Sequence, residues 1–196
     1  MNIIERVKNI LLSPKTEWDV VRTETATPQS LLMAYVIPLA VVAALGSLLK
    51  GLFFAGTAGI MFFIITAVIT LVSTAVSFFV SVIIVDMLAP SFDSEKNMGR
   101  SAQLVAYAFT PFYVGSLLSF LPFVGMLISL AALAYGIYLM YLGIGPMKKT
   151  PEDKKIVYMI VVFLIWLVIY FVLIAILGAI LFAAMGITAA ATGLLG

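Results

Sequence analysis

Charged residues along this chain are gathered into three short stretches, and the segments between them are almost entirely apolar. Nineteen of the twenty charged residues lie in residues 5–24, 86–100 and 148–155, and only Lys50 stands apart. This segregation is typical of a chain that crosses a membrane several times, because a charge at the centre of a bilayer is costly. The pattern therefore predicts an all-α fold, a polytopic transmembrane helical bundle.

The apolar segments predict five membrane spans, since each crossing needs about 20 apolar residues. The first span follows Thr27 and Pro28, residue types that favour the cap and the first turn of a helix. A later apolar run is too long for one helix, and the turn signal at residues 121–125 divides it. The predicted spans are residues 31–49, 60–85, 103–120, 125–145 and 156–184.

Five spans place the two termini on opposite sides of the membrane. If the amino terminus is cytoplasmic, ten of the eleven basic residues lie in cytoplasmic segments and Lys50 alone lies outside. Basic residues in short loops favour the cytoplasm, so we expect the amino terminus there and the carboxyl terminus outside. Residues 1–26 then form a cytoplasmic amphipathic interfacial segment, and residues 27–196 form a five-helix transmembrane domain.

Composition agrees with a membrane protein and argues against several functions. The chain is 64% hydrophobic and 10% charged, whereas a soluble domain is usually about a quarter charged. A net charge of +2, without basic runs interleaved with aromatic residues, does not favour nucleic-acid binding. The sequence has no Cys and no His, and it shows no adjacent nucleophile and base, HExxH motif or paired intramembrane carboxylates. We therefore expect no enzyme activity and no catalytic, cofactor-binding or metal-binding residues.

The cytoplasmic segment predicts two short amphipathic helices lying along the membrane interface. The apolar arc of the first helix consists of Ile3, Ile4, Val7, Ile10 and Leu11. The second begins at Ser13 and Pro14 and carries Trp18, whose ring suits the level of the lipid headgroups. These helices either cap the bundle or dock a partner or lipid, and the sequence leaves both interpretations open.

A basic loop at residues 148–155 is the second candidate contact with lipid or a partner. Anionic lipid attracts such residues by about 1 kcal/mol each near the surface, although the same loop also serves as a topology determinant. The candidate partner-binding or lipid-binding residues are Arg6, Lys8, Trp18, Lys148, Lys149, Lys154 and Lys155.

Polar residues inside the spans form a second candidate site. Hydroxyl residues recur at helical spacing along the second span, either for close helix packing or for a permeation path. In the third span, Pro111 predicts a kink. The candidate intramembrane polar face comprises Thr66, Thr70, Thr74, Ser77, Ser81, Tyr107, Thr110 and Pro111. Asp86, at the end of the second span, is expected to pair with Arg100 across the loop.

Several segments carry a family resemblance: residues 6–18, Tyr35 and Pro38 in the first span, residues 107–111, and residues 135–145 with the lysine-rich loop and last span that follow. They resemble the bacterial branch of the Yip family, the Ypt-interacting proteins. The resemblance implies a five-span protein of the bacterial inner membrane. Eukaryotic members associate with prenylated Rab-type GTPases and with each other. This chain lacks their long cytosolic amino-terminal region and their Asp-Leu-Tyr-Gly-Pro type of motif, so binding of a Rab-type GTPase is not expected here.

Two functional hypotheses follow from the residues and the resemblance together. The first is a non-enzymatic membrane adaptor or organiser that acts through its cytoplasmic face, with the lipid bilayer, a membrane-protein partner or a second copy as its contact. The alternative is a small-solute channel or permease-like facilitator that uses the hydroxyl-lined face of the second span.

Overall fold

The computed structural model describes residues 2–54, 56–118 and 120–191, and every regular element in these ranges is a helix. The chain divides into two compact units, one ending at Met159 and one beginning at Ile160. The second unit is the continuation of helix α9 (Glu152–Ala191). The first unit contains every other element and is described below.

Four helical segments are long and apolar enough to cross a membrane: Pro28–Leu49, Thr66–Phe92, Phe123–Lys148 and Glu152–Leu173. They coincide with the first, second, fourth and fifth predicted spans, which supports an integral membrane protein. The third predicted span is not one continuous helix. It is divided into α6 (Met98–Ala108) and α7 (Thr110–Ser116).

The division between α6 and α7 follows from Pro111, which lies in the first turn of α7. Proline has no N–H to donate, and its ring clashes with the carbonyl four residues earlier, so α6 ends before it. The interruption that the sequence predicts at this position is therefore present. A further turn at residues 117–121 leads into α8 (Pro122–Lys148), which begins before the predicted Gly125 because Pro122 suits the first position of a helix.

The first span is a single rod built from α3 (Pro28–Leu31), a π-helical turn η1 (Leu32–Val36) and α4 (Ile37–Phe54). Thr27 forms the predicted cap, and its Oγ1 accepts a hydrogen bond from the Ser30 N–H at 3.1 Å. The π turn ends two residues before Pro38, which cannot donate to the carbonyl of Ala34. Widening the helix by one residue accommodates that lost hydrogen bond without ending the rod.

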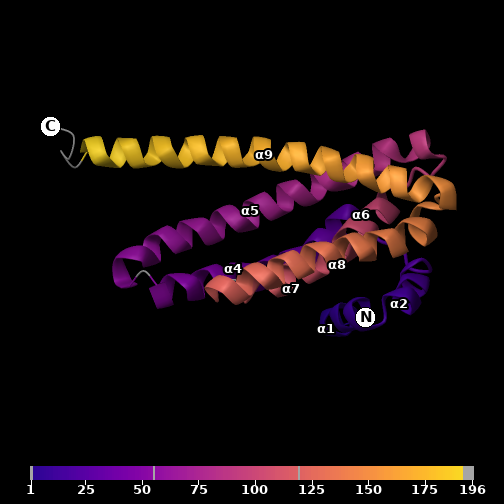
Figure 1. Cartoon of the computed structure of the whole chain (residues 1–196), viewed down its shortest axis with the longest axis horizontal. Helices are drawn as coiled ribbons and strands as arrows, with labels where there is room; N and C mark the ends of the chain where they lie inside the picture. The colour runs from indigo at the N-terminus through magenta and orange to yellow at the C-terminus, as the bar shows by residue number, and fades with distance from the viewer. Residues whose placement is uncertain (1, 55, 119, 192–196) are drawn as a thin grey trace. The chain divides into compact units, whose positions relative to one another are not determined.

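Helix α5 (Gly56–Leu88) returns alongside α4, and the 3-10 turn η2 (Ala89–Phe92) ends it (Figure 1). The α6–α7 pair then follows the first rod in the same direction, and α8 packs back along both α6 and α7. Glycines permit these close approaches. A Cβ added at Gly136 would lie 3.0 Å from the Ala108 carbonyl oxygen, and one at Gly115 would lie 3.1 Å from the Ile128 side chain.

The amino-terminal helices α1 (Ile3–Leu12) and α2 (Pro14–Val21) form a hairpin that packs on the bundle, with α1 against α7 and α2 against α8. The inward side of α1 presents Arg6 and Ile10, whereas Ile4 and Leu12 are more than two-thirds exposed. The buried face is therefore rotated from the apolar arc that the sequence predicts. The reason is that Arg6 pairs with the buried Glu17 and the partly exposed Glu24 in the folded chain.

Candidate functional site

The polar end of the bundle, where α5, α6 and α8 come together, contains a buried ion pair. Lys148 Nζ lies 3.0 Å from Asp86 Oδ1, and both side chains are almost fully buried. The same carboxylate oxygen accepts hydrogen bonds from the Ser101 hydroxyl at 2.9 Å and the Asn97 N–H at 2.8 Å. The expected pairing of Asp86 with Arg100 is therefore wrong, because the end of α8 brings Lys148 closer to the carboxylate.

The Ser101 hydroxyl also accepts a hydrogen bond from Lys148 Nζ at 2.7 Å. A serine beside a lysine can act as a nucleophile and base when the lysine is neutral and substrate can reach the serine. Here the lysine is paired with a carboxylate, and Ser101 and Lys148 both have zero exposed area. The fold thus brings together, in a buried setting, a hydroxyl and an amine that lie 47 residues apart in the sequence.

A second buried charge cluster holds the α1–α2 hairpin. Arg6 lies 2.5 Å from both Glu17 and Glu24, and its guanidinium lies 5.2 Å from the centre of the Tyr107 ring. A planar guanidinium suits two carboxylates and an aromatic face at once. Arg6 and Tyr107, which the sequence assigns to different candidate sites, are therefore neighbours.

Trp18 secures the other side of the hairpin through packing. Its ring is 1% exposed and lies edge-on to Tyr107, with ring centres 6.1 Å apart. A Cβ added at Gly143 would come within 2.6 Å of the indole, so only glycine leaves room for it. The indole N–H is buried without a hydrogen-bond partner among the described residues. The ring is thus covered by protein and does not face lipid headgroups as the sequence suggests.

Arg100 links the end of α2 to α6. Its Nη1 donates to the carbonyl oxygens of Val21 and Glu24 at 3.2 and 3.0 Å, and the Gln103 side chain donates to the same two carbonyls. Carbonyl groups at a helix end lack partners within the helix. Arg100 and Gln103 supply them, which ties the charged stretch at residues 5–24 to the stretch at residues 86–100.

The remaining predicted basic residues lie toward the surface. Lys8 is exposed on α1, Lys149 pairs with Glu95 at 2.7 Å, Lys154 pairs with Asp93, and Lys155 pairs with Glu152 at 2.5 Å. The Lys149 ion pair lowers the pKa of the exposed Glu95 carboxyl, first through their hydrogen bond and then through their charges. Lys149 and Lys154 with their acidic partners form an exposed charged rim at this end of the bundle, and Lys8 on α1 is not part of it.

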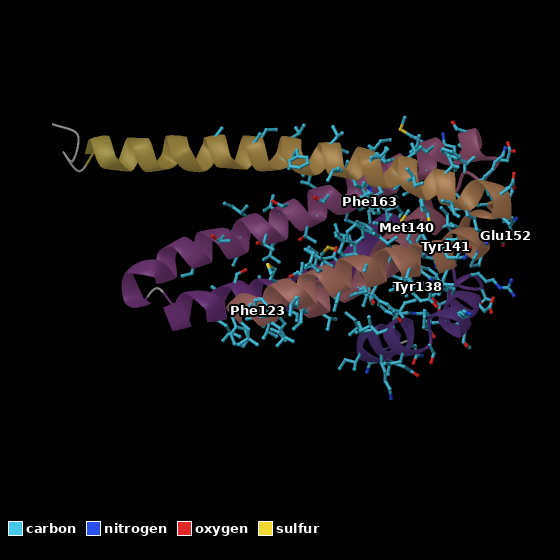
Figure 2. The ribbon with its side chains drawn as sticks, viewed as in Figure 1. Phe123, Tyr138, Met140, Tyr141, Glu152 and Phe163 are labelled. Carbon is cyan, nitrogen blue, oxygen red and sulfur yellow. The ribbon has the colours of Figure 1, made fainter. Side chains whose placement is uncertain are left out.

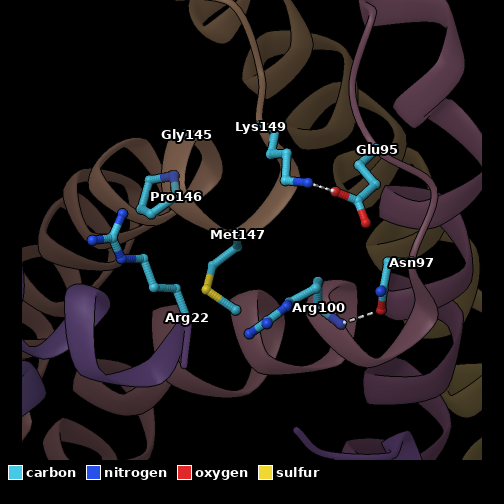
Figure 3. A pocket seen from close by; sticks show the side chains of 8 residues that line it. All are labelled: Arg22, Glu95, Asn97, Arg100, Gly145, Pro146, Met147 and Lys149. Carbon is cyan, nitrogen blue, oxygen red and sulfur yellow. Dashed lines mark hydrogen bonds and ion pairs between the residues drawn. The ribbon is translucent and has the colours of Figure 1, made fainter. Parts of the chain in front are cut away.

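A cavity of about 390 Å³ opens within this rim (Figure 3). Its lining combines basic, acidic, polar and apolar residues from three stretches of the sequence: Arg22, Glu95, Asn97, Arg100, Gly145, Pro146, Met147 and Lys149. Arg22 and Arg100 were not predicted as site residues. Their signal in the sequence was limited to membership of two charged stretches, which does not indicate that the two side chains converge.

Of the five hydroxyl residues predicted on the second span, Ser81 is buried. The other four are only partly buried: Thr66, Thr70, Thr74 and Ser77. The Thr70 hydroxyl donates to the Thr66 carbonyl of its own helix at 2.8 Å.

Tyr107 and Thr110 of the third predicted span contact Tyr35 of the first. The Thr110 and Tyr35 hydroxyl oxygens lie 2.8 Å apart, and the Tyr35 and Tyr107 rings meet edge to face. The buried partner of Tyr107 and Thr110 is thus the π turn of the first span.

Tyrosines also mark the polar half of α8. Tyr138 and Tyr141 lie toward that end, and Phe123 lies at the opposite end of the same helix (Figure 2). The Tyr135 hydroxyl donates to the Leu11 carbonyl at 2.7 Å. Tyr135 therefore supplies a hydrogen-bond donor to a backbone carbonyl at the end of α1. Among the described residues, no group of three or more His, Cys, Asp or Glu side chains could hold a metal ion.

A family model described as the Yip1 domain matches residues 8–176 of the chain. The chain belongs to the Yip1 domain family. The match begins within α1 and ends within α9, so α2, the Asp86–Lys148 pair and the cavity lie inside the Yip1 domain, whereas Arg6 lies two residues before the matched range. Comparison with curated proteins and with solved structures gives no match.

Proposed function

We propose that this Yip1-domain protein is a non-enzymatic membrane adaptor or organiser that acts through its cytoplasmic face. That face comprises residues 1–26, 86–102 and 146–155. The observation that carries the proposal is the convergence of all three charged stretches on one polar end of the bundle. Arg100 joins the first stretch to the second, and Glu95 with Lys149 joins the second to the third.

The architecture of this face favours recognition by a rigid surface. Its scaffold is buried: the Asp86 pair, the Arg6 cluster and Trp18 hold it in place. Its rim is exposed and charged. Surfaces that are already ordered bind partners at low entropic cost. This face meets that condition, because buried contacts fix its helices while its charged side chains remain exposed.

The proposal includes a five-span topology in which α6 and α7 together form the third crossing. Gly99, at the start of α6, lies close to the Ala26 carbonyl just before the first rod. Gly46, within the first rod, lies close to the Ser116 carbonyl at the end of α7. Twenty residues of helix rise about 30 Å, which equals the thickness of the hydrocarbon core. The α6–α7 pair therefore covers the same depth as residues 26–46, despite its break. On this topology the amino terminus is cytoplasmic and the carboxyl terminus is outside, in the inner membrane of a bacterium.

Single cysteines test the topology cleanly, because the chain has none of its own. A cysteine at Lys8 or Lys149 is expected to react with an impermeant maleimide only after the cytoplasmic side is opened. A cysteine at Lys50 is expected to react from the outside. Reaction of Lys8→Cys and Lys50→Cys from the same side would contradict the five-span arrangement.

Site-specific crosslinking in native membranes tests the adaptor role. A photoreactive residue at Lys149, on the polar rim, is expected to capture a defined membrane protein or a second copy of the chain. The matched control is the same residue at Phe123, a highly exposed apolar position at the other end of α8. Capture at both positions alike, or at neither, would count against a specific cytoplasmic surface.

Transport is the competing hypothesis, and the hydroxyl residues of the second span would carry it. Neither the cavity of Figure 3 nor an apolar cavity of about 370 Å³ beside α7 and α8 is lined by them. The Thr70 hydroxyl also uses its proton within its own helix. Solute flux into vesicles that contain the protein, lost on combined Thr70→Val, Thr74→Val and Ser77→Ala substitution, would favour transport over the adaptor role.

A further inference from the structure

The cavity of Figure 3 brings together cations from three segments that are remote in sequence. Arg22 follows α2, Arg100 lies in the first turns of α6, and Lys149 caps the end of α8. Glu95 is the one carboxylate among its eight lining residues. The cavity therefore carries an excess of positive charge on a surface of modest size.

The three cations are held to different degrees. Arg100 is fixed by two backbone carbonyls through Nη1, which orients its planar group at the cavity wall. Arg22 and Lys149 have side chains that are 57% and 79% exposed, and their partners Asp19 and Glu95 are also exposed. Exposed ion pairs contribute little stability, so an incoming anion can exchange with either carboxylate at small cost.

Surrounding groups strengthen the positive potential. The amino-terminal end of α6 lies at the cavity through its cap residue Asn97, and a helix amino terminus carries partial positive charge. The lowered pKa of Glu95 arises first from Lys149, with smaller contributions from Lys148 and Arg100. These observations indicate a positive electrostatic potential at the cavity.

We infer that this cavity binds a phosphate-bearing anion, with the exposed Arg22 and Lys149 and the hydrogen-bonded Arg100 as its contacts. Arginine presents a fork of donors that matches phosphate oxygens, and lysine adds a compact charge. The volume of about 390 Å³ suits a small ligand group and not a protein domain. The phosphate belongs either to a lipid headgroup at the cytoplasmic surface or to a soluble compound. The inference rests on the proposed function, since it names what the cytoplasmic face recognises.

The test uses the purified full chain in detergent, with short-chain phosphatidic acid and inorganic phosphate as separate probes. Lipid binding is measured by native mass spectrometry, and phosphate is added as its competitor and also alone in a calorimetric titration. The pocket variant combines Arg22→Gln with Lys149→Gln. The control combines Lys8→Gln with Lys15→Gln, which removes the same charge from exposed positions outside the cavity.

At about 1 kcal/mol for each cation near an anionic group, the pocket variant is expected to raise the Kd about 25-fold. The control pair is expected to change it less than about twofold, since diffuse charge is screened by salt. Glu95→Gln is expected to tighten binding, because Lys149 then has no competing carboxylate. Both pocket side chains are exposed, so an unchanged melting temperature verifies that the variant is folded.

Each outcome bears on the inference. Saturable lipid binding that depends on the pocket pair supports a headgroup, and phosphate binding with the same dependence but no lipid binding supports a soluble ligand. Equal weakening by pocket and control pairs, or no saturable binding of either probe, overturns the phosphate site. The crosslinking experiment at residue 149 distinguishes failure of the phosphate site from failure of the adaptor role. If a specific partner is captured but the chain binds neither probe, the phosphate site is refuted and the adaptor role stands.

Discussion

Lys148 donates a hydrogen bond to Asp86 across a sequence separation of 62 residues, and its Nζ lies 3.0 Å from the carboxylate oxygen in a buried setting. The pair closes the polar end of the bundle by joining the last turn of α8 to the last turn of α5. Ser101 lies between the two and contacts both.

Removing either member of the pair is expected to destabilise the protein more than removing both. Asp86→Asn or Lys148→Met alone leaves a buried charge without its counterion, which typically costs about 3–5 kcal/mol. The double variant removes both charges and is expected to recover a large part of that loss. Denaturant unfolding in detergent measures the cycle. Additive losses in the double variant would show that the two groups do not interact.

Gly143→Ala is expected to loosen the amino-terminal hairpin. The added Cβ would lie within 2.6 Å of the Trp18 ring and 2.8 Å of Leu104 Cδ1, and overpacking of this kind costs about 1–3 kcal/mol. Faster tryptic cleavage after Lys15 and Arg22 would report the release. Gly178→Ala is the matched control, because a Cβ there meets nothing within 4 Å. Equal cleavage rates in wild type and Gly143→Ala would contradict the packing account.

Tyr35→Phe and Thr110→Val each remove one end of a buried hydrogen bond between the π turn and the start of α7. An unpaired buried hydroxyl costs about 1–3 kcal/mol, whereas removing both partners is nearly neutral. The melting temperature is therefore expected to fall in Thr110→Val, which leaves the Tyr35 hydroxyl unpaired, and to rise again when Tyr35→Phe is added. A further fall in the double variant would indicate that another group satisfies Tyr35.

The Glu95–Lys149 pair predicts a small loss of stability in acid. Lys149 lowers the pKa of Glu95 below its ordinary value of 4.5 in the folded protein. The pair therefore contributes stability above that ordinary value and loses it as the pH falls through the lower, folded-state pKa. Carbon-13 NMR of labelled glutamate measures the titration. In Lys149→Gln the pKa is expected to move up toward 4.5, and an unmoved pKa would rule out Lys149 as the cause.

Local rules predicted several elements correctly from sequence. Thr27 and Pro28 open the first rod, and the division of the third span lies next to Pro111, because backbone hydrogen bonding and proline geometry act within a few residues. The position of the next turn was less accurate. Pro122 starts α8 before Gly125, since proline at the first helical position outweighs glycine as a turn signal.

Contacts between remote segments were predicted less well. Arg100 is close in sequence to Asp86 and was expected to be its partner, but it binds the carbonyls of Val21 and Glu24 instead. Trp18 was expected at the headgroup level and is enclosed by protein. Neither outcome can be read from spacing along one helix, because each depends on which side of a second helix faces the residue.

The sequence by itself determined that the chain lies in a membrane, because the cost of burying charge in lipid separates polar from apolar segments over long runs. It also determined the family, since the Yip1 domain model matches residues 8–176. It also confined nearly all the charge to three stretches. Only the tertiary structure decided which of those charges are buried in ion pairs and which are exposed. Asp86, Lys148 and Arg6 are buried in paired clusters, while Arg22 and Lys149 remain outward around a cavity. The physical reason is that pairing of buried charges depends on distances of a few ångströms between helices, which hydrophobicity along the chain does not specify.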